Sequence, residues 1–385
     1  MRALGLIAAV LIVAGCGGGD GVERAVSTST LPSGANPHPA AGTFEPDGTT
    51  IEQCKGDTAC LEQAFGNLAY YEGPKAALAR FDAQMKTDHA LAANCHRTAH
   101  VIGAGALARY KEVSKAFAEG SASCWSGYYH GILERAFQDV PFRERELAEK
   151  SVDLCDDASI RRVTWIAYQC VHGLGHGLMI YTGYDLPGSL KTCDDLRTGF
   201  DRVSCSGGVF MENIDSSYGV KSKWLRDDDP VYPCRDVQEQ HKLYCYLMVT
   251  SRTLQLNGYD FDQTAATCKT VEKDWVETCF NSMGRDASGQ STQSPKRVVE
   301  LCSKAGRDYW DDCIWGAARD MAATFSNGER ASELCLLLPE TMRSTCFWQV
   351  GTILGTMSPT PDGRRQLCAP APKRYLGDCV AGASA

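Results

Sequence analysis

The sequence predicts an all-α protein, an α-solenoid of about nine helical hairpins, and three observations support this prediction. Cysteines recur in couples at a near-constant interval, apolar residues recur at helical spacing between the couples, and Gly, Asn or Asp interrupts the helical pattern at regular points. The chain has 385 residues, of which 44% are hydrophobic and 22% charged, so it can bury a large core. Its 19 cysteines are more than a reduced cytosolic enzyme usually carries.

The chain opens with an export signal. Arg2 precedes an apolar run over residues 3–15, which is too short to span a membrane. The run ends in Val-Ala-Gly followed by Cys16, which resembles the lipobox of bacterial lipoproteins. The resemblance implies that residues 1–15 are a signal peptide and that Cys16 carries acyl chains that anchor the protein to a membrane. Gly17 then favours the outer membrane in a cell with two membranes; the alternative is an ordinary secretory signal with an incidental cysteine.

The rest of the chain divides by composition. Residues 16–50 are rich in Gly, Ser, Thr and Pro and show no apolar period, which predicts a flexible, lipidated tether. Residues 51–385 form one α/α repeat domain in this interpretation. Its first half, 51–230, carries most of the histidines, and its second half, 231–385, has the regular repeat of 33 to 34 residues.

Removing Cys16 leaves 18 cysteines, an even number that suits disulfides in an oxidising compartment. Zinc is disfavoured, because zinc-binding cysteines usually stand two to four residues apart. For Cys54, Cys60, Cys95 and Cys124 the spacing leaves the pairing open, with 54/60 and 95/124 as a guess. The other fourteen form seven predicted intra-hairpin disulfides: Cys155 and Cys170, Cys193 and Cys205, Cys234 and Cys245, Cys268 and Cys279, Cys302 and Cys313, Cys335 and Cys346, and Cys368 and Cys379.

One repeat shows why each unit is a helical hairpin. PKRVVELC, from Pro295 to Cys302, has helical apolar spacing after a proline suited to a first turn. After a break at Gly306, a longer helical pattern with acidic residues at its start runs to Phe325 and ends at Ser-Asn-Gly. Such two-helix units resemble the tetratricopeptide-like helical-repeat class, although the Trp, Leu-Gly and Pro positions of that consensus are missing. The resemblance implies a binding surface for a protein or peptide.

Three couples of residues at i, i+4 spacing follow cysteines in the second helices of consecutive hairpins: His96 and His100, His130 and Glu134, and His172 and His176. Residues at this spacing share one helical face. Second helices of neighbouring hairpins lie side by side in a solenoid, so the couples are predicted to converge, with Glu212 from the next hairpin. Glycines crowd these helices, and we expect them to permit close helix approach.

This cluster predicts a metal site for one or two ions of Zn, Fe, Mn, Cu or Ni, with His96, His100, His130, Glu134, His172, His176 and Glu212 as ligands. Glu134, Glu212 and Tyr129 are candidates for catalytic roles, as ligand, base or acid. The alternative is that the histidines only pack. The metal hypothesis requires ring nitrogens within about 5 Å of a common point.

Charge and motifs bear on the other classes of function. The net charge is −8 and no dense basic tract is present, so we expect no nucleic-acid partner. No Ser-His-Asp order, phosphate loop or dinucleotide motif occurs. The alternative function is a non-catalytic scaffold that docks another envelope protein or a peptide. Packing roles are assigned to His38, His89 and His241, and ion pairing between neighbouring repeats, rather than a charged groove for a peptide or saccharide, to Arg252, Arg285, Asp286, Arg319 and Asp320.

Overall fold

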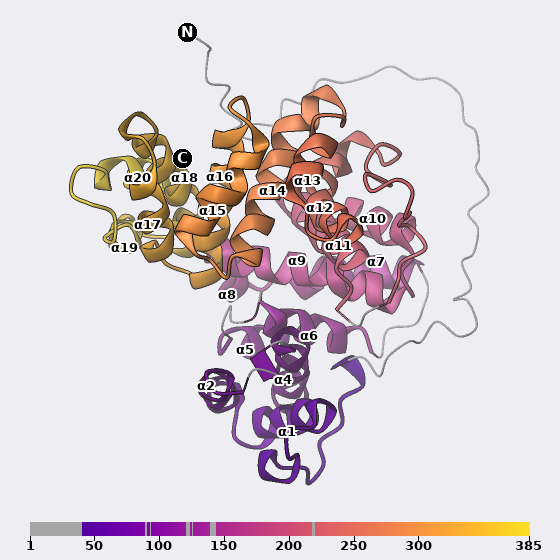
Figure 1. Ribbon diagram of the computed structural model, residues 1–385. Helices are drawn as coiled ribbons and strands as arrows, with labels where there is room; N and C mark the ends of the chain where they lie inside the picture. The colour runs from indigo at the N-terminus through magenta and orange to yellow at the C-terminus, as the bar shows by residue number, and fades with distance from the viewer. Residues whose placement is uncertain are drawn as a thin grey trace.

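The structure is a computed structural model that describes residues 41–88, 91–92, 94–120, 124, 126–138, 144–217 and 220–385. The signal peptide, Cys16, His38 and His89 lie outside these residues. The predicted all-α class is confirmed, because every helix or strand assigned within the described residues is a helix (Figure 1). No helix in these ranges has the length and apolar character needed to cross a membrane.

The longer helices form one continuous row in which each packs against the next along the chain. They are α1 (Thr58–Tyr71), α4 (Cys95–Tyr110), α6 (Gly127–Ala136), α9 (Thr164–Tyr181), α11 (Gly199–Ile214), α12 (Glu239–Asn257), α14 (Val276–Gln290), α16 (Trp310–Phe325), α18 (Glu340–Leu354) and α20 (Leu376–Gly382). These are the second helices of the predicted hairpins. The row therefore confirms that second helices lie side by side.

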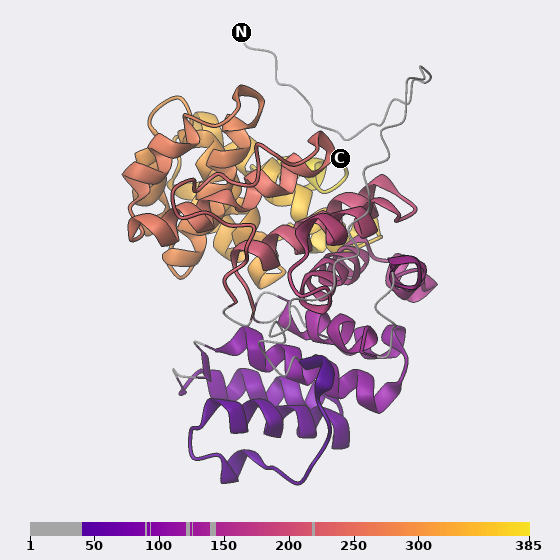
Figure 2. The ribbon, with the colours of Figure 1, turned by 90° about the vertical axis from the view of Figure 1, so that its right-hand side faces the viewer.

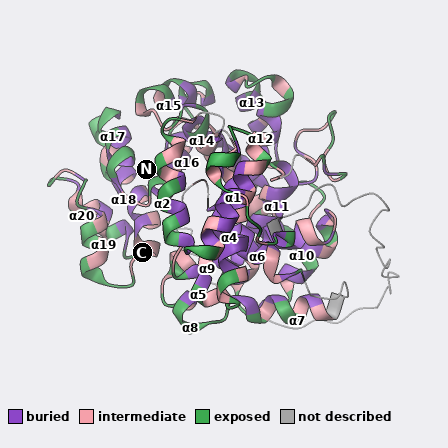
Figure 3. Ribbon diagram, turned by 90° about the horizontal axis from the view of Figure 1, so that it is seen from below, coloured by how far each residue is buried: buried purple, intermediate pink, exposed green. Residues whose placement is uncertain are grey.

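Other helices, most of them shorter, connect the members of the row. They are α2 (Pro74–Met85), α5 (Val113–Phe117), α7 (Glu144–Leu154), α8 (Ala158–Arg161), α10 (Leu186–Asp194), α13 (Phe261–Cys268), α15 (Pro295–Cys302), α17 (Glu329–Leu337) and α19 (Pro361–Leu367), with short 3₁₀ turns η1 (Ala41–Thr43), η2 (Ile51–Gln53), η3 (Lys273–Trp275), η4 (Ser303–Ala305) and η5 (Gly355–Met357). Of these helices, α2 and α7 are longer than α6 and α20 of the row. Buried faces dominate α4, α6 and α9 in Figure 3, whereas α8, α15 and α19 show exposed residues at the periphery.

Local sequence signals set the ends of these helices. The side chain of Asp260 caps α13 by accepting a hydrogen bond from the Gln263 amide, and Pro295 starts α15 at a position where no amide hydrogen is needed. Helix α12 ends at Gly258 and α16 at Ser326, both in the left-handed conformation. The predicted boundaries of the second helix in the 295–328 repeat agree with α16.

Nine disulfides staple the described residues. All seven predicted couples are paired, and Cys54–Cys60 and Cys95–Cys124 are paired as guessed. In four of the five regular repeats the bridge joins the end of a connecting helix to the first turns of the next long helix, as Cys302 in α15 and Cys313 in α16 do. In the remaining one Cys234 lies in a turn and is joined to Cys245 of α12. In the chain-entropy model a closed loop this short contributes about 2 to 3 kcal/mol to stability.

Residues on the N-terminal side of residue 51 also pack against the helices. Phe44 is buried against Ala104 of α4, and the Arg135 side chain of α6 donates to the Phe44 carbonyl. Residues 41–50 are thus attached to the helical body.

The N-terminal helices form one layer in Figure 2, with the C-terminal helices grouped above them.

The row curves back on itself. Turn η5, which follows α18, contacts α9, so the helices from α9 to α18 form a partly closed ring. Residues far apart in sequence can therefore face one another across its interior. The closure places side chains of α14 and α16 near the histidine-bearing helices.

Glycines allow direct backbone contact between successive long helices. A Cβ atom added to Gly284 of α14 would overlap the carbonyl oxygen of Cys313 in α16, and one added to Gly316 would overlap the carbonyl oxygen of Asn281. The same reciprocal contact recurs in three further helix pairs, at Gly103 and Gly131, Gly175 and Gly208, and Gly351 and Gly382. The expected role of glycine in close helix approach is confirmed.

Replacing Gly284 with Ala should lower the free energy of unfolding by about 1 to 3 kcal/mol, the usual cost of overpacking, despite the better helix propensity of Ala. Urea denaturation of the oxidised protein measures this change. Gly377→Ala in α20 is the matched control, because no atom lies within 4 Å of its added Cβ. Equal stability of the Gly284→Ala variant and the wild type would contradict the packing argument.

Candidate metal centre

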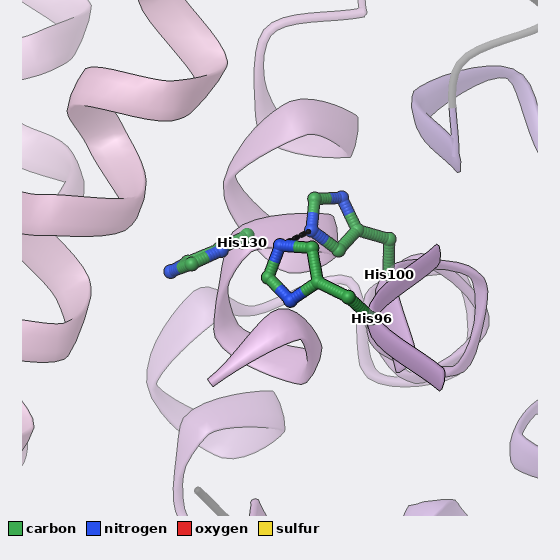
Figure 4. A group of neighbouring side chains, drawn as sticks. All are labelled: His96, His100 and His130. Atoms are coloured by element: carbon green, nitrogen blue, oxygen red, sulfur yellow. Dashed lines mark hydrogen bonds between the residues drawn. The ribbon is translucent and has the colours of Figure 1, made fainter. Parts of the chain in front are cut away.

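Five histidines from three adjacent helices meet in the interior. His96 and His100 project from α4, His130 from α6, and His172 and His176 from α9. Figure 4 shows His96 and His100 side by side on α4 and His130 reaching the same space from α6. His96 is half-buried, and the other four are at most 3% exposed.

The histidines form two groups that share one member. The first contains His96, His100 and His130, and the second contains His130, His172 and His176. Within each group the ligand atoms lie within 4.8 Å of one another. The predicted convergence of the three helices is confirmed, and either group could hold a metal ion.

In four of the histidines a partner engages Nδ1. The carbonyl oxygen of Cys124 lies 2.8 Å from Nδ1 of His96, and the hydroxyl of Tyr168 lies 3.2 Å from Nδ1 of His172. Carboxylates hold the other two, Glu134 on Nδ1 of His100 and Glu212 at 2.9 Å from Nδ1 of His176. Such contacts fix the orientation of each ring and leave Nε2 as the nitrogen that can bind an ion.

The Nε2 atoms of His96 and His100 face each other at 3.0 Å (Figure 4). Two nitrogens bound to one tetrahedral zinc ion, each at about 2.0 to 2.1 Å from the metal, are about 3.3 to 3.4 Å apart. The separation in α4 is therefore close to that of two ligands of one ion.

His130 differs from the other four. Neither of its ring nitrogens has a hydrogen-bond partner, although the residue is 1% exposed. Its ring stacks on that of His176 with centroids 4.1 Å apart, and Nε2 of His176 is also without a partner. Buried nitrogens without partners are costly, which makes them unusual in a cluster that only packs.

The two carboxylates stand behind the histidines. Glu212 is fully buried and accepts hydrogen bonds from the Tyr184 hydroxyl at 2.7 Å and from the Ser217 amide and hydroxyl at 2.9 and 2.6 Å. Glu134 contacts His100 and is 6% exposed. The predicted ligand role of Glu134 and Glu212 stays a prediction, because the two groups with ligand spacing contain only histidines among the described residues.

Burial keeps the imidazoles of His96, His130, His172 and His176 neutral. Loss of hydration is the first cause, and charge repulsion between rings adds to it, so the pKa values of His96, His130 and His172 lie well below the usual range and the pKa of His176 falls to about 3. Neutral imidazole is the form that binds metal ions. Burial also raises the pKa of Glu212, and hydrogen bonds from Ser217 and Tyr184 act against that rise.

Glycine contacts bring the histidine helices together. A Cβ on Gly131 of α6 would overlap the carbonyl of His100, and a Cβ on Gly208 of α11 would overlap the carbonyl of His172. The histidine side chains therefore project from helices whose backbones are in direct contact. For this reason the ring centroids of His96 and His130 are only 5.3 Å apart.

A cavity of about 550 Å³ adjoins the cluster. His96 and His176 line it together with polar and charged residues of α12, α14 and α16 and of the segment that follows α11. Among these are Arg285, Asp286 and Asp320, for which ion pairing between neighbouring repeats was expected. Arg285 does pair with the adjacent Asp286 at 2.7 Å, and both side chains also face the cavity.

Other predicted residues lie elsewhere. The Tyr129 ring packs on Phe117 of α5, and burial raises the pKa of Tyr129 to about 12, so its acid role stays a prediction. His241 is outside both groups, with Nδ1 3.1 Å from the Ser206 hydroxyl and Nε2 3.2 Å from Asp194. These two contacts agree with the packing role expected for His241.

Several supporting residues were not predicted. Tyr168 precedes His172 by one helical turn, so the i, i+4 rule could have found it. Tyr184 and Ser217 reach Glu212 from loops, and the Cys124 carbonyl meets His96 through the backbone. No residue pattern in the sequence predicts those contacts.

Comparison with known proteins adds no assignment. Searches of protein-family models, of curated proteins and of solved structures find no match to the chain.

The depressed pKa of His130 predicts a pH effect on stability. The unfolded chain binds a proton on His130 below about pH 6.5, and the folded chain does not. Proton binding therefore stabilises the unfolded chain as the pH falls below about 6.5, and the free energy of unfolding decreases from its value at pH 7. The difference in free energy of unfolding between wild type and His130→Gln, both metal-free, should shift against the wild type by up to about 2 kcal/mol between pH 7 and pH 5.

Urea denaturation with a chelator present measures this difference. The comparison with the variant is needed because Asp215 and Asp320, whose pKa values are raised to about 6, titrate in the opposite sense in the same range. A difference that is constant from pH 7 to pH 5 would show that His130 is not held neutral.

Proposed function

We propose that this protein is a transition-metal-binding protein whose histidine cluster holds two ions and supports metal-dependent chemistry in the adjoining cavity. One observation carries the proposal: four histidines have Nδ1 fixed by a partner, while His130 at their centre has no partner on either nitrogen. A cluster that only packed would satisfy its buried nitrogens, as His241 does.

The count of two ions rests on the position of His130. It belongs to both ligand groups, and an imidazole has one nitrogen on each side of the ring. In Figure 4 one of these nitrogens lies toward His96 and the other points away from it. A neutral imidazole has one free lone pair. His130 would thus serve one ion with His96 and His100 and a second with His172 and His176 only after losing its N–H proton to solvent and becoming an imidazolate.

The donor set limits the metal. Neutral imidazole suits Zn, Cu, Fe or Ni, and hard cations such as Ca²⁺ prefer oxygen ligands. Three nitrogen ligands per ion leave positions open, and a metal with an open position can activate water or polarise a bound group. The Glu134 and Glu212 carboxylates would act by orienting His100 and His176 and by offsetting the positive charge of the ions.

The compartment is also part of the proposal. Nine disulfides favour an oxidising, extracytoplasmic location. We propose that lipidated Cys16 attaches the protein to the cell envelope, on the basis of the lipobox resemblance alone.

The untagged protein, equilibrated with zinc and desalted, should contain two zinc ions per chain by elemental analysis. Replacing His172 and His176 together by Ala should leave at most one ion, and His130→Gln should weaken both sites. His241→Ala is the control, because it removes a buried histidine outside the cluster and should keep both ions. Full zinc content in the His172→Ala, His176→Ala variant would refute the second site, and a zinc-free wild type would refute the proposal.

Glu212→Gln separates two roles for the carboxylate within the same experiment. If Glu212 only supports His176, the Glu212→Gln variant should still bind two ions, one of them with an affinity about 10 to 100 times weaker. If Glu212 is itself a ligand, the variant should lose that ion under the same conditions.

The anchor has its own test. The full-length protein expressed with its signal should incorporate labelled palmitate and fractionate with membranes, whereas Cys16→Ser should do neither, because it removes the thiol that is acylated. Identical fractionation and labelling of both proteins would rule out lipidation at Cys16.

A further inference from the structure

The cavity beside the cluster has two chemically different parts. His96 and His176 form one part, and acidic side chains of α14, α16 and the end of α11 form the other. Its volume of about 550 Å³ is within the range of small-molecule sites, about 300 to 1,000 Å³. A ligand in this space could reach both parts at once.

Three carboxylates, Asp215, Asp286 and Asp320, surround one guanidinium in the acidic part, that of Arg285. Arg285 donates to Asp286, and Asp286 also accepts hydrogen bonds from Thr250 and Ser251 at 2.6 and 3.0 Å. Within the described part of the chain, neither Asp215 nor Asp320 forms an ion pair. The acidic part therefore carries more negative than positive charge.

The second guanidinium that lines the cavity does not offset this charge. Arg97 is paired at 3.0 Å with Glu62, which lies outside the lining. Arg97 is thus matched by one carboxylate. The Arg285 charge is shared among Asp215, Asp286 and Asp320, so the acidic part has an excess of negative charge that a cationic ligand would offset and an anionic ligand would increase.

The carboxylates are accessible, and the surrounding protein lowers the hydration of Asp215 and Asp320. Asp215 is exposed to the cavity, and Asp286 and Asp320 are half-buried. Protein packed around the cavity reduces hydration, and the charge of Asp286 adds to this effect, so that the pKa values of Asp215 and Asp320 rise to about 6. A bound cation would relieve this cost.

The other part of the cavity borders the proposed metal centre. Nε2 of His176 has no partner, the residue is 1% exposed, and it lines the cavity. The carboxylates and the His176 side chain thus line the same cavity.

We propose that the cavity binds a small organic cation, with its guanidinium or ammonium group held by Asp215, Asp286 and Asp320 and its remaining part directed to the histidine centre. The proposal rests on the proposed function, because it names the substrate class of that metal centre. Carboxylates recognise guanidinium through paired, charge-assisted hydrogen bonds, which gives the acidic part its selectivity.

The test compares two probes of the same shape. N-Butylguanidinium is charged and cannot lose its proton near neutral pH, so it does not bind a metal through nitrogen, and N-butylurea is its neutral counterpart. Titration calorimetry on the full-length, zinc-loaded protein at pH 7.5 should give at least about tenfold tighter binding of N-butylguanidinium, the effect of one charge-assisted contact.

Variants locate the site. Asp215→Asn combined with Asp320→Asn should weaken N-butylguanidinium binding about tenfold or more and leave N-butylurea binding unchanged. Asp320→Asn alone should act in the same direction, and thermal unfolding of each variant checks that it is folded. Asp362→Asn, an exposed carboxylate at the start of α19, is the control and should change neither affinity.

The outcomes separate this inference from the metal proposal, because zinc content is measured on the same samples. Equal binding of the two probes, or binding of neither, by a protein that holds two zinc ions overturns the cation site and leaves the metal centre standing. A preference for N-butylguanidinium that depends on the carboxylates in a protein without zinc supports the cation site and overturns the metal centre.

Discussion

Backbone contact between successive long helices is the constraint on which the rest of this structure depends. At Gly103 and Gly131, at Gly175 and Gly208, and at two further pairs, a helix lies directly against the carbonyl oxygens of its neighbour, and no side chain separates them. Each glycine lowers helix propensity by about 1 kcal/mol relative to Ala. The gain is a short distance between helix axes, which lets side chains on three different helices converge in one small volume.

The histidine cluster uses that short distance. Imidazole is a small ring, and five of them meet only because α4, α6, α9 and α11 approach so closely. Burial then has two effects on the same groups. It keeps the His130 ring neutral, and it removes water from nitrogens that lack protein partners, above all those of His130. Neutral nitrogens without hydrogen bonds have a high free energy in a protein interior, and a metal ion lowers it.

The sequence predicted the elements better than their closure. Cysteine spacing predicted the hairpins because a disulfide has a fixed reach, and i, i+4 spacing predicted which face of α4 and α9 carries histidine. Curvature depends on small rotations that accumulate from one repeat to the next, and no local residue pattern records their sum. The contact of η5 with α9, and with it the approach of Asp320 to His176 across one cavity, therefore could not be predicted. The carboxylates behind the histidines were recognised as members of the site, but spacing alone does not distinguish a ligand from the partner of a ligand.

The Cys95–Cys124 disulfide has a consequence for how the protein matures. His96 follows Cys95 directly, and its Nδ1 meets the carbonyl oxygen of Cys124, so one covalent bridge connects a proposed ligand to the group that orients it. In the reduced chain these two groups belong to segments 29 residues apart with no bond between them. For the proposed metal centre, oxidation would therefore help to complete the ligand set, and an ion met earlier, in a reducing compartment, would find His96 without this covalent support.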